Sequence, residues 1–216
     1  MDPPIGLLGG SFDPIHAGHQ ALARAACDEL ALAQLLLVPA AQPWQKGPLS
    51  DGAQRARMIE LAIAGDARLR VDRCELERGG ASYTIDTLRE MRARFGAQTP
   101  LVLVIGADQM ERLDTWHEWT ALLQFAHLGV ARRNDAVLVL SCPLQEFYNT
   151  HWARPAVLGA QAAGCVIEIA MPPHDASATE VRALLQAPAA VQRDARLAQI
   201  VPVAVLDYIR QHHLYA

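Results

Sequence analysis

Residues 9–19 read Gly-Gly-Ser-Phe-Asp-Pro-Ile-His-Ala-Gly-His, between an apolar run at 5–8 and a segment with helical spacing. This order predicts a buried strand, a glycine-rich loop and a helix. The two glycines let a ligand approach backbone N–H groups, and a helix N-terminus favours an anion. His16 and His19 are three residues apart, which places both on the same side of the first helical turn. The stretch predicts a phosphate site, although a glycine-rich turn with two helix-capping histidines accounts for any two of these features.

Short apolar runs alternate with helix-like segments along most of the remaining chain. Strands are predicted at 5–8, 35–39, 68–72, 101–105, 127–131 and 166–169. Helices are predicted at 16–33, 51–64, 84–95, 177–186 and 202–212, and 134–164 is left without an assignment. Continuous apolar runs are typical of parallel strands covered on both faces. The pattern predicts one α/β domain over 1–216, with a doubly wound, mostly parallel, Rossmann-like sheet and a small helical C-terminal part.

The composition excludes several classes of protein. With 51% hydrophobic and 19% charged residues, the 216-residue chain can form a sizeable core, so disorder is excluded. A net charge of −4 argues against a nucleic-acid partner. No apolar run is long enough to span a bilayer, residues 1–4 lack signal-peptide character, and the four cysteines form no CxxC pair. We expect a cytoplasmic protein without a membrane partner, a zinc site or a disulfide framework.

Lysine usage singles out one position. Of the 19 basic residues, 18 are arginine, and Lys46 is the only lysine. A coding bias that replaces lysine wherever arginine is harmless would leave a lysine where the exchange is harmful. Survival by chance is the alternative.

Residues 9–19 resemble the signature of the nucleotidylyltransferase superfamily, whose core is (H/T)xGH at the start of the first helix. The long form GGSFDPxHxGH is similar to that of the bacterial nicotinate-nucleotide adenylyltransferases, and pantetheine-phosphate adenylyltransferases open in a similar way. The resemblance implies that His16 and His19 contact the triphosphate of ATP and stabilise the pentavalent transition state. It also implies ATP contacts from the loop and first helical turn, namely at Gly9, Gly10, Ser11, Phe12 and Gly18.

Segments 82–88 (SYTIDTL) and 116–119 (WHEW) resemble the nicotinate branch of this superfamily. The resemblance implies that Trp116 covers the pyridine ring and that backbone N–H groups near Ile85 and His117 bind its carboxylate. It also implies that Thr84 contacts the mononucleotide. From the residues alone, Thr84 or Asp86 would cap a helix, and paired tryptophans more often anchor a core.

Three further segments match ATP-binding motifs of the family. Gly106 and Asp108 follow a strand, as in the IGxD motif, where the carboxylate contacts ribose. Residues 177–182 (SATEVR) match SxTxxR, which implies phosphate contacts from Ser177, Thr179 and Arg182; the S-x-x-E pattern also predicts a helix cap. Lys46 corresponds to the lysine of the PxxPHK loop, but Gln45 stands where the family has histidine.

The resemblance, which covers nearly the whole chain, implies adenylyl transfer from ATP to nicotinate mononucleotide, giving deamido-NAD and pyrophosphate. Catalytic roles are implied for His16, His19, Lys46 and Arg182, with Mg²⁺ carried by ATP and no dedicated protein metal site. The alternatives are the same chemistry on nicotinamide mononucleotide or phosphopantetheine, and a non-catalytic nucleotide sensor. The sequence leaves a homo-oligomer open.

Overall fold

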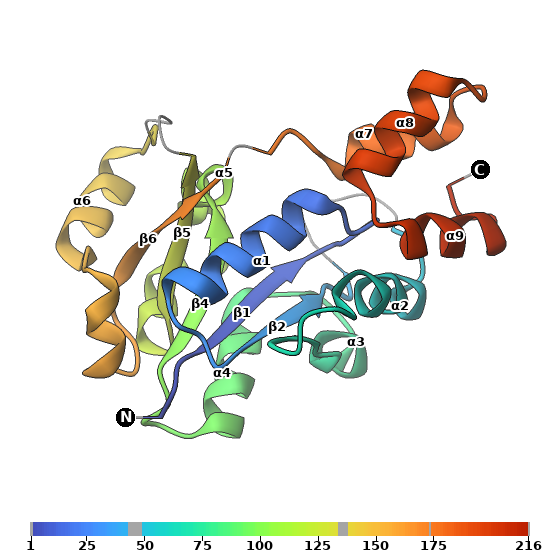
Figure 1. The fold of residues 1–216 in the computed structure, drawn as a ribbon. Coiled ribbons are helices and arrows are strands. Elements are labelled where there is room, and N and C mark those ends of the chain that lie inside the picture. The colour runs from blue at the N-terminus through green and yellow to red at the C-terminus, as the bar shows by residue number, and fades with distance from the viewer. Residues whose placement is uncertain (1, 43–48, 134–137, 173, 216) are drawn as a thin grey trace.

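A single parallel sheet forms the centre of the molecule (Figure 1). The computed structural model describes residues 2–42, 49–133, 138–172 and 174–215. The strands of this part are β1 (Ile5–Gly10), β2 (Gln34–Pro39), β3 (Leu69–Val71), β4 (Leu101–Gly106), β5 (His127–Arg133) and β6 (Val166–Met171). They pair in parallel in the order β3-β2-β1-β4-β5-β6. The strand order therefore reverses between β1 and β4, where open α/β sheets bind their ligands.

Both faces of the sheet are covered, as the continuous apolar strands predict. In β2, Leu35 and Leu37 pack into one hydrophobic core, while Leu36 and Val38 pack into the other. Because successive side chains point to opposite faces of a strand, a run such as Leu-Leu-Leu-Val fills both cores at once. The doubly wound α/β fold is confirmed.

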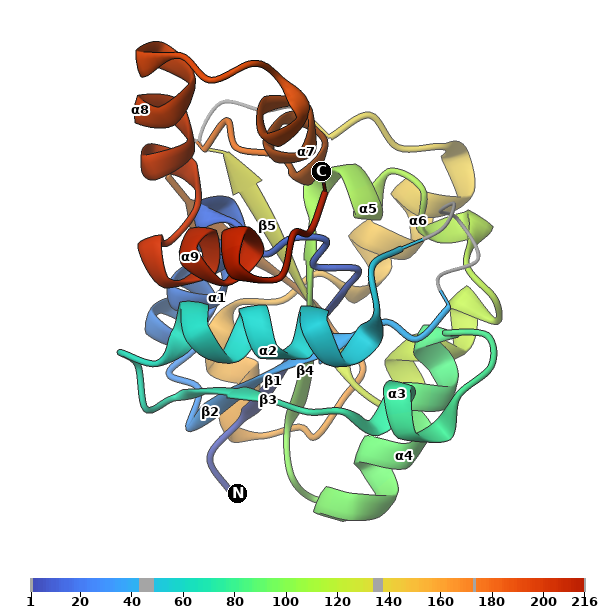
Figure 2. The same ribbon diagram turned by 90° about the vertical axis from the view of Figure 1, so that its right-hand side faces the viewer.

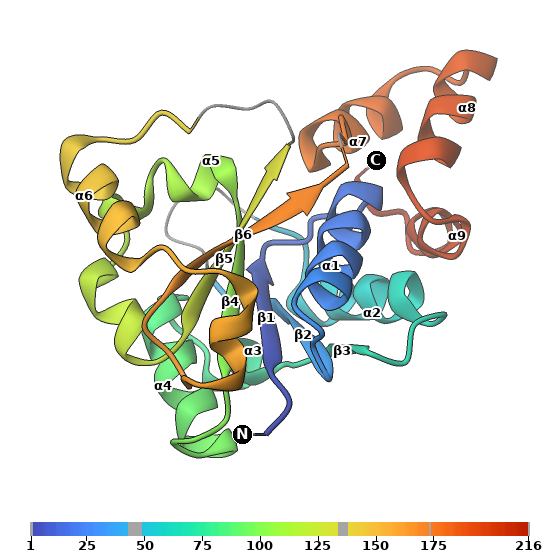
Figure 3. The ribbon, with the colours of Figure 1, turned by 60° about the vertical axis from the view of Figure 1, so that its left-hand side comes forward.

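Different helices cover the two faces of the sheet (Figure 3), and their apolar side chains fill the two cores. The first core receives side chains from α1 (Ala17–Glu29), α2 (Gly52–Ile63), α7 (Ala178–Gln186), α8 (Val191–Ile200) and α9 (Val203–Gln211). The second receives side chains from α3 (Cys74–Arg78), α4 (Thr84–Phe95), α5 (Ala107–Met110), α6 (Cys142–His151) and the 3₁₀ helices η1 (Leu113–Thr115) and η2 (Trp119–Gln124).

Most predicted helix ends agree with the structure. The side chain of Asp51 caps α2 by accepting from the backbone N–H of Ala53 at 2.9 Å. That of Ser177 caps α7 by accepting from the N–H of Glu180 at 3.1 Å. The helix predicted over 16–33 instead ends at Glu29, because Ala31 adopts a left-handed conformation with φ 48° that no α-helix accommodates.

The interpretation of Thr84 or Asp86 as a helix cap is wrong. Tyr83 occupies the cap position of α4, with no side-chain cap hydrogen bond, and Thr84 is the first helical residue. The carboxylate of Asp86 accepts a hydrogen bond from Arg89 instead.

The sequence did not reveal the short elements. These are α3, α5, η1, η2, α8, and, within the described part of 134–164, α6 and η3 (Pro155–Gly159). Most span one or two turns, too few to show a helical period. Two of the longer ones lie beside helix-breaking signals: α6 carries Pro143, and α8 follows Pro188.

The helices α7, α8 and α9 gather beyond the end of β1, and α9 lies along α2 (Figures 1 and 2). They form the predicted helical C-terminal part. Within the described ranges, no helix is long and apolar enough to cross a bilayer.

Candidate functional site

A cavity of about 360 Å³ opens where the strand order reverses. Its walls come from the carboxyl ends of β1 and β4, the first turns of α1 and α4, and the segment before η2. Of the residues singled out in the sequence, it is lined by Gly9, Gly10, Ser11, His19, Thr84, Gly106, Asp108 and Trp116. Motifs within residues 9–19 and motifs within residues 84–116 therefore meet in one cavity.

The glycine-rich loop is buried from Ser11 to His16. The ring of Phe12 is fully buried and packs edge-on against that of His19, with 4.9 Å between centroids. The backbone of Phe12 is left-handed, with φ 47°, a conformation that bulky residues adopt only when their surroundings hold them. Phe12 thus supports His19 from behind, and its side chain is not among those that line the cavity.

The two histidines lie against each other as their spacing predicts. Their ring centroids are 3.8 Å apart. The backbone N–H of His16 donates to Nδ1 of His19 at 3.3 Å. Because Nδ1 of His19 accepts this hydrogen bond, the proton of the neutral imidazole lies on Nε2. The Nε2–H group of His19 can then donate to phosphate oxygens. His19 lines the cavity, whereas the His16 ring is buried beside it.

Gly18 allows another segment to approach α1 closely. A Cβ at this position would lie 3.1 Å from Nδ1 of His16 and 3.5 Å from the carbonyl oxygen of Ala176. A side chain here would crowd the His16 ring and would be in van der Waals contact with the segment that leads into α7. Gly18 therefore brings the beginning of α7 to the beginning of α1.

Arg182 extends this contact into the loop. Its Nη1 donates to the carbonyl oxygen of Asp13 at 2.7 Å, and its Nη2 lies 3.5 Å from Oγ1 of Thr179. The hydroxyl of Ser177 accepts from the Glu180 N–H as the cap of α7. None of these three SxTxxR residues is among those that line the cavity, so the structure places the motif beside the loop and outside the cavity wall.

Arg55 of α2, missed in the sequence, is a buried residue that supports the site from outside the cavity lining. It is 1% exposed, and burial lowers the pKa of its guanidinium. Its nitrogens donate to three carbonyl oxygens, those of Ser50 at 2.8 Å, Ser11 at 2.8 Å and Ala40 at 2.7 Å. Arg55 thus joins the glycine-rich loop to the end of β2 and to the start of α2. Its position three residues before Met58, on the apolar face of the predicted helix, was the available signal.

Lys46 and Gln45 lie outside the described residues. The described residues on either side of this segment are held firmly, because Arg55 binds the carbonyl oxygens of both Ala40 and Ser50. The backbone N–H of Ala41 also donates to Oγ of Ser82 at 2.8 Å.

Trp116 and the first turn of α4 form the other end of the cavity. The indole packs partly against the second core, and its buried Nε1 has no hydrogen-bond partner among the described residues. Thr84 begins α4, where the first N–H groups of a helix have no acceptor within the helix. The side chain of Ile85 is fully buried in the core, so only its backbone can serve a ligand.

His117 is not among the residues that line this cavity. Its exposed ring stacks on Tyr83 with 4.5 Å between centroids. Arg89 connects segment 82–88 to segment 116–119. It donates to Asp86 at 3.1 Å and to Glu118 at 2.6 Å. Hydrogen bonding to Arg89 lowers the pKa of the Glu118 carboxyl.

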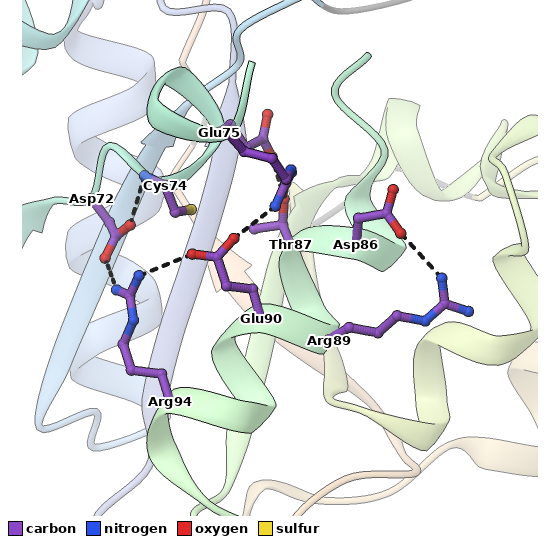
Figure 4. Close-up of polar contacts among 9 residues, drawn as sticks. Asp72, Cys74, Glu75, Asp86, Thr87, Arg89, Glu90 and Arg94 are labelled. Carbon is purple, nitrogen blue, oxygen red and sulfur yellow. Dashed lines mark hydrogen bonds and ion pairs between the residues drawn. The ribbon is translucent and has the colours of Figure 1, made fainter. Parts of the chain in front are cut away.

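A buried carboxylate, missed in the sequence, lies beside the first turn of α4. Glu75 is 7% exposed, lines the cavity, and accepts from the Thr87 hydroxyl at 2.6 Å (Figure 4). Arg78 donates to the same hydroxyl at 2.9 Å and pairs with Glu90 at 2.8 Å. This network ties α3 to α4 and so fixes the α4 N-terminus.

Asp108 lies exposed at the end of β4, and its Oδ2 accepts from the Gln109 side chain at 2.8 Å. Gly106 leaves room for this carboxylate, because a Cβ there would lie 2.5 Å from Asp108 Oδ1. In the part of the chain that the structure describes, no three His, Cys, Asp or Glu side chains gather as metal ligands.

A larger hollow of about 710 Å³ lies between the start of α2 and α3. It is lined by Asp51, Arg73 and Glu77, among others, and by none of the residues 9–19. Because it is away from the switch point of the sheet, we place the site in the smaller cavity.

The Cytidylyltransferase-like family matches residues 7–184. Curated relatives that span the chain include a "Probable nicotinate-nucleotide adenylyltransferase" of Chromobacterium violaceum, 41% identical, with 100% of each chain covered. Another of the same description, from Bordetella petrii, is 42% identical, with 98% of each chain covered. A solved structure of Plasmodium falciparum nicotinic acid mononucleotide adenylyltransferase complexed with NaAD aligns with a TM-score of 0.75 at 16% identity, covering 99% of this chain and 97% of that one. The structural likeness shows the fold.

Proposed function

The chain belongs to the Cytidylyltransferase-like family and, within it, to the nicotinate-nucleotide adenylyltransferases, and we propose that it transfers the adenylyl group of ATP to nicotinate mononucleotide. The products are deamido-NAD and pyrophosphate. The observation that carries the proposal is one cavity lined by the glycine-rich loop at one end and by Thr84 and Trp116 at the other. A joint site for a triphosphate and a pyridine nucleotide needs both ends.

The reaction is a direct displacement at the α-phosphorus of ATP. An oxygen of the mononucleotide phosphate forms the new bond to this phosphorus, while the bond to the bridging oxygen of the β-phosphate breaks and pyrophosphate leaves. The attacking phosphate is already an anion near neutral pH, so the step requires no general base. The protein contributes positioning and stabilisation of charge.

Donors at the glycine-rich end serve the triphosphate in this proposal. The Nε2–H of His19 and the α1 N-terminus meet phosphate oxygens, as helix N-termini do in many phosphate sites. His16, Arg182 and Lys46 add positive charge or donors, with Arg182 reaching inward from its contact with Asp13. The backbone of Gly9, Gly10 and Ser11 contacts the ATP nucleotide. The carboxylate of Asp108 accepts hydrogen bonds from the ribose hydroxyls.

The other end recognises the pyridine ring and its carboxylate. Trp116 stacks on the ring, and backbone N–H groups near Ile85 and His117 bind the carboxylate. Arg89, which contacts both segments, already pairs with Asp86 and Glu118, which favours backbone donors for this role. A carboxamide presents NH₂ to one of these donors, so the acid is the preferred substrate.

Mg²⁺ enters with ATP in this proposal. The described residues offer no cluster of metal ligands, and Mg²⁺ commonly keeps several waters while bridging substrate phosphates. The ion neutralises phosphate charge when it is bound, and the side chains named above orient the substrate.

Release of pyrophosphate from ATP, measured with a panel of acceptors, tests the proposal. Nicotinate mononucleotide should give the highest kcat/KM, with nicotinamide mononucleotide far behind and no turnover on phosphopantetheine. Highest activity on either other acceptor would reassign the substrate. ATP binding without turnover on any acceptor would indicate a nucleotide sensor.

A further inference from the structure

Asp13 lies inside the glycine-rich loop, three residues before His16, and is 4% exposed. Three segments that are distant in sequence converge on it. The hydroxyl of Tyr215 donates to Oδ1 at 2.6 Å, the N–H of Ser50 donates to Oδ2 at 3.4 Å, and Arg182 donates to the carbonyl oxygen at 2.7 Å. Asp13 is thus the point at which the loop is attached to the start of α2, to α7 and to the turn after α9.

Tyr215 reaches Asp13 from a well-anchored element. The buried side chains of Val205, Leu206 and Ile209 seat α9 in the first core, and α9 lies along α2 (Figure 2). The turn that follows is closed by the N–H of Leu214, which donates to the carbonyl oxygen of Ile209 at 3.0 Å. Tyr215 is therefore separated from a helix packed in the first core by a single hydrogen-bonded turn.

The backbone of Tyr215 is held in an uncommon conformation. Its φ of 65° lies in the left-handed region, where a bulky residue persists only if the surrounding structure fixes it. Burial, followed by the hydrogen bond to Asp13, raises the pKa of the tyrosine hydroxyl, which keeps it a neutral donor. A tyrosine in this position supplies one directed hydrogen bond to a buried carboxylate without adding charge.

We propose that Tyr215 is a positioning residue for adenylyl transfer, acting through Asp13 to hold the glycine-rich loop and Arg182 where they meet the triphosphate. The inference rests on the proposed function. Without the hydroxyl, the buried Asp13 carboxylate loses the shorter of its two hydrogen bonds, and the N–H of Ser50 at 3.4 Å is left. The guanidinium groups of Arg182 and Arg55 are both bonded to backbone carbonyl oxygens of this loop, those of Asp13 and Ser11. The carboxylate then draws Arg182 onto itself and away from the triphosphate.

Tyr215→Phe tests this inference because it removes one oxygen and retains the ring. We expect kcat to fall about tenfold and KM for ATP to rise about fivefold, since small displacements of positioned groups cost ~10²-fold at the extreme. KM for nicotinate mononucleotide should stay within twofold of native. The matched control is Tyr208→Phe, which alters a tyrosine of α9 whose ring stacks on His212, and should leave all three parameters unchanged.

Asp13→Asn completes a double-mutant cycle with Tyr215→Phe. The amide keeps the size of the Asp13 side chain and cannot carry a negative charge. In this background, Tyr215→Phe should change kcat less than twofold, because no carboxylate remains to capture Arg182. Each variant is assayed well below its own Tm, measured by circular dichroism, so that loss of fold is separated from loss of position.

The native protein is assayed first, which separates the two proposals. No deamido-NAD from nicotinate mononucleotide and ATP would overturn the proposed function. An active native enzyme with Tyr215→Phe within twofold in kcat and in KM for ATP would overturn this inference alone. The same holds if KM rises equally for both substrates, or if Tyr215→Phe costs as much in the Asp13→Asn background as in the native one.

Discussion

At the glycine-rich end of the cavity, buried or half-buried side chains from distant segments hold the backbone, whereas at the Trp116 end much of the support is exposed. Arg55, Arg182 and Tyr215 come from α2, α7 and the turn after α9, and all bind loop residues 11–13. At the other end, Arg89 and Glu118 connect α4 to the segment before η2 with both side chains about 40% exposed (42% and 41%).

Exposed ion pairs contribute little to stability, while buried groups that lose a partner cost far more. The glycine-rich end is therefore fixed before substrate arrives. At the pyridine end the Glu75 network holds the start of α4, and we expect the adjustment to the ligand in the segment that carries Trp116. Changes at the first end should reduce turnover strongly, and changes at the second should mainly alter acceptor binding.

Removing an imidazole from the fixed end should have the largest effect. We expect His19→Ala to lower kcat at least about a hundredfold while the fold survives, since lost transition-state electrostatics commonly cost ~10²–10³. Pyrophosphate release and circular dichroism measure the two properties. The control is His212→Ala, an exposed histidine after α9. Near-normal turnover in a folded His19→Ala protein would remove His19 from the mechanism.

Arg55→Lys should impair both fold and turnover. An ammonium cannot bond the carbonyl oxygens of Ser11, Ala40 and Ser50 in the same plane, so at least one buried acceptor loses its donor. We expect the free energy of unfolding to fall by about 2 kcal/mol and kcat by roughly 30-fold. Urea denaturation and steady-state kinetics measure these, with Arg57→Lys, an exposed neighbour paired with Glu60, as the control. Equal stability of the two variants would contradict the role given to Arg55.

Lys46→Arg keeps the charge and should still reduce kcat/KM for ATP, by about tenfold, the equivalent of one hydrogen bond to a charged group. A guanidinium does not replace a compact ammonium in a tight triphosphate contact. Steady-state kinetics with varied ATP measure the change. Full activity would mean that Lys46 is a lysine left by chance.

Trp116→Ala tests the adjustable end and should have the smallest effect on turnover. We expect KM for both pyridine mononucleotides to rise about three- to tenfold, since stacking adds roughly 0.5–1.5 kcal/mol beyond area burial. KM for ATP should be unchanged. Trp152→Ala, at a half-exposed tryptophan on another face, is the control. A larger change in kcat than in KM for the acceptors would contradict the claim that the Trp116 end mainly affects acceptor binding.

Local signals predicted the fold and the lining of the cavity well. The apolar runs gave the strands, and the spacing of His16 and His19 placed their rings together, because both depend on neighbours in sequence. Asp51 and Ser177 cap α2 and α7 for the same reason.

Contacts between distant segments could not be predicted. The hydrogen bond from Tyr215 to Asp13 spans 202 residues, and that from Arg55 to Ser11 spans 44. An arginine in an amphipathic helix and a tyrosine after one are ordinary in sequence, and only the packing of α2 and α9 on the sheet directs them to the loop. The buried Glu75 is similar, since its partner Thr87 lies on a different helix.

The ratio of kcat/KM for nicotinate mononucleotide to that for nicotinamide mononucleotide, in the native protein and in Trp116→Ala, tests the account most directly. Hydrogen bonds to a charged group contribute about 1.5–3 kcal/mol each, so two backbone donors predict at least about a hundredfold preference for the acid. The preference should persist in Trp116→Ala, because that variant retains the backbone donors. A native enzyme that uses the amide as well as the acid would contradict the account of the pyridine end and of the substrate it selects.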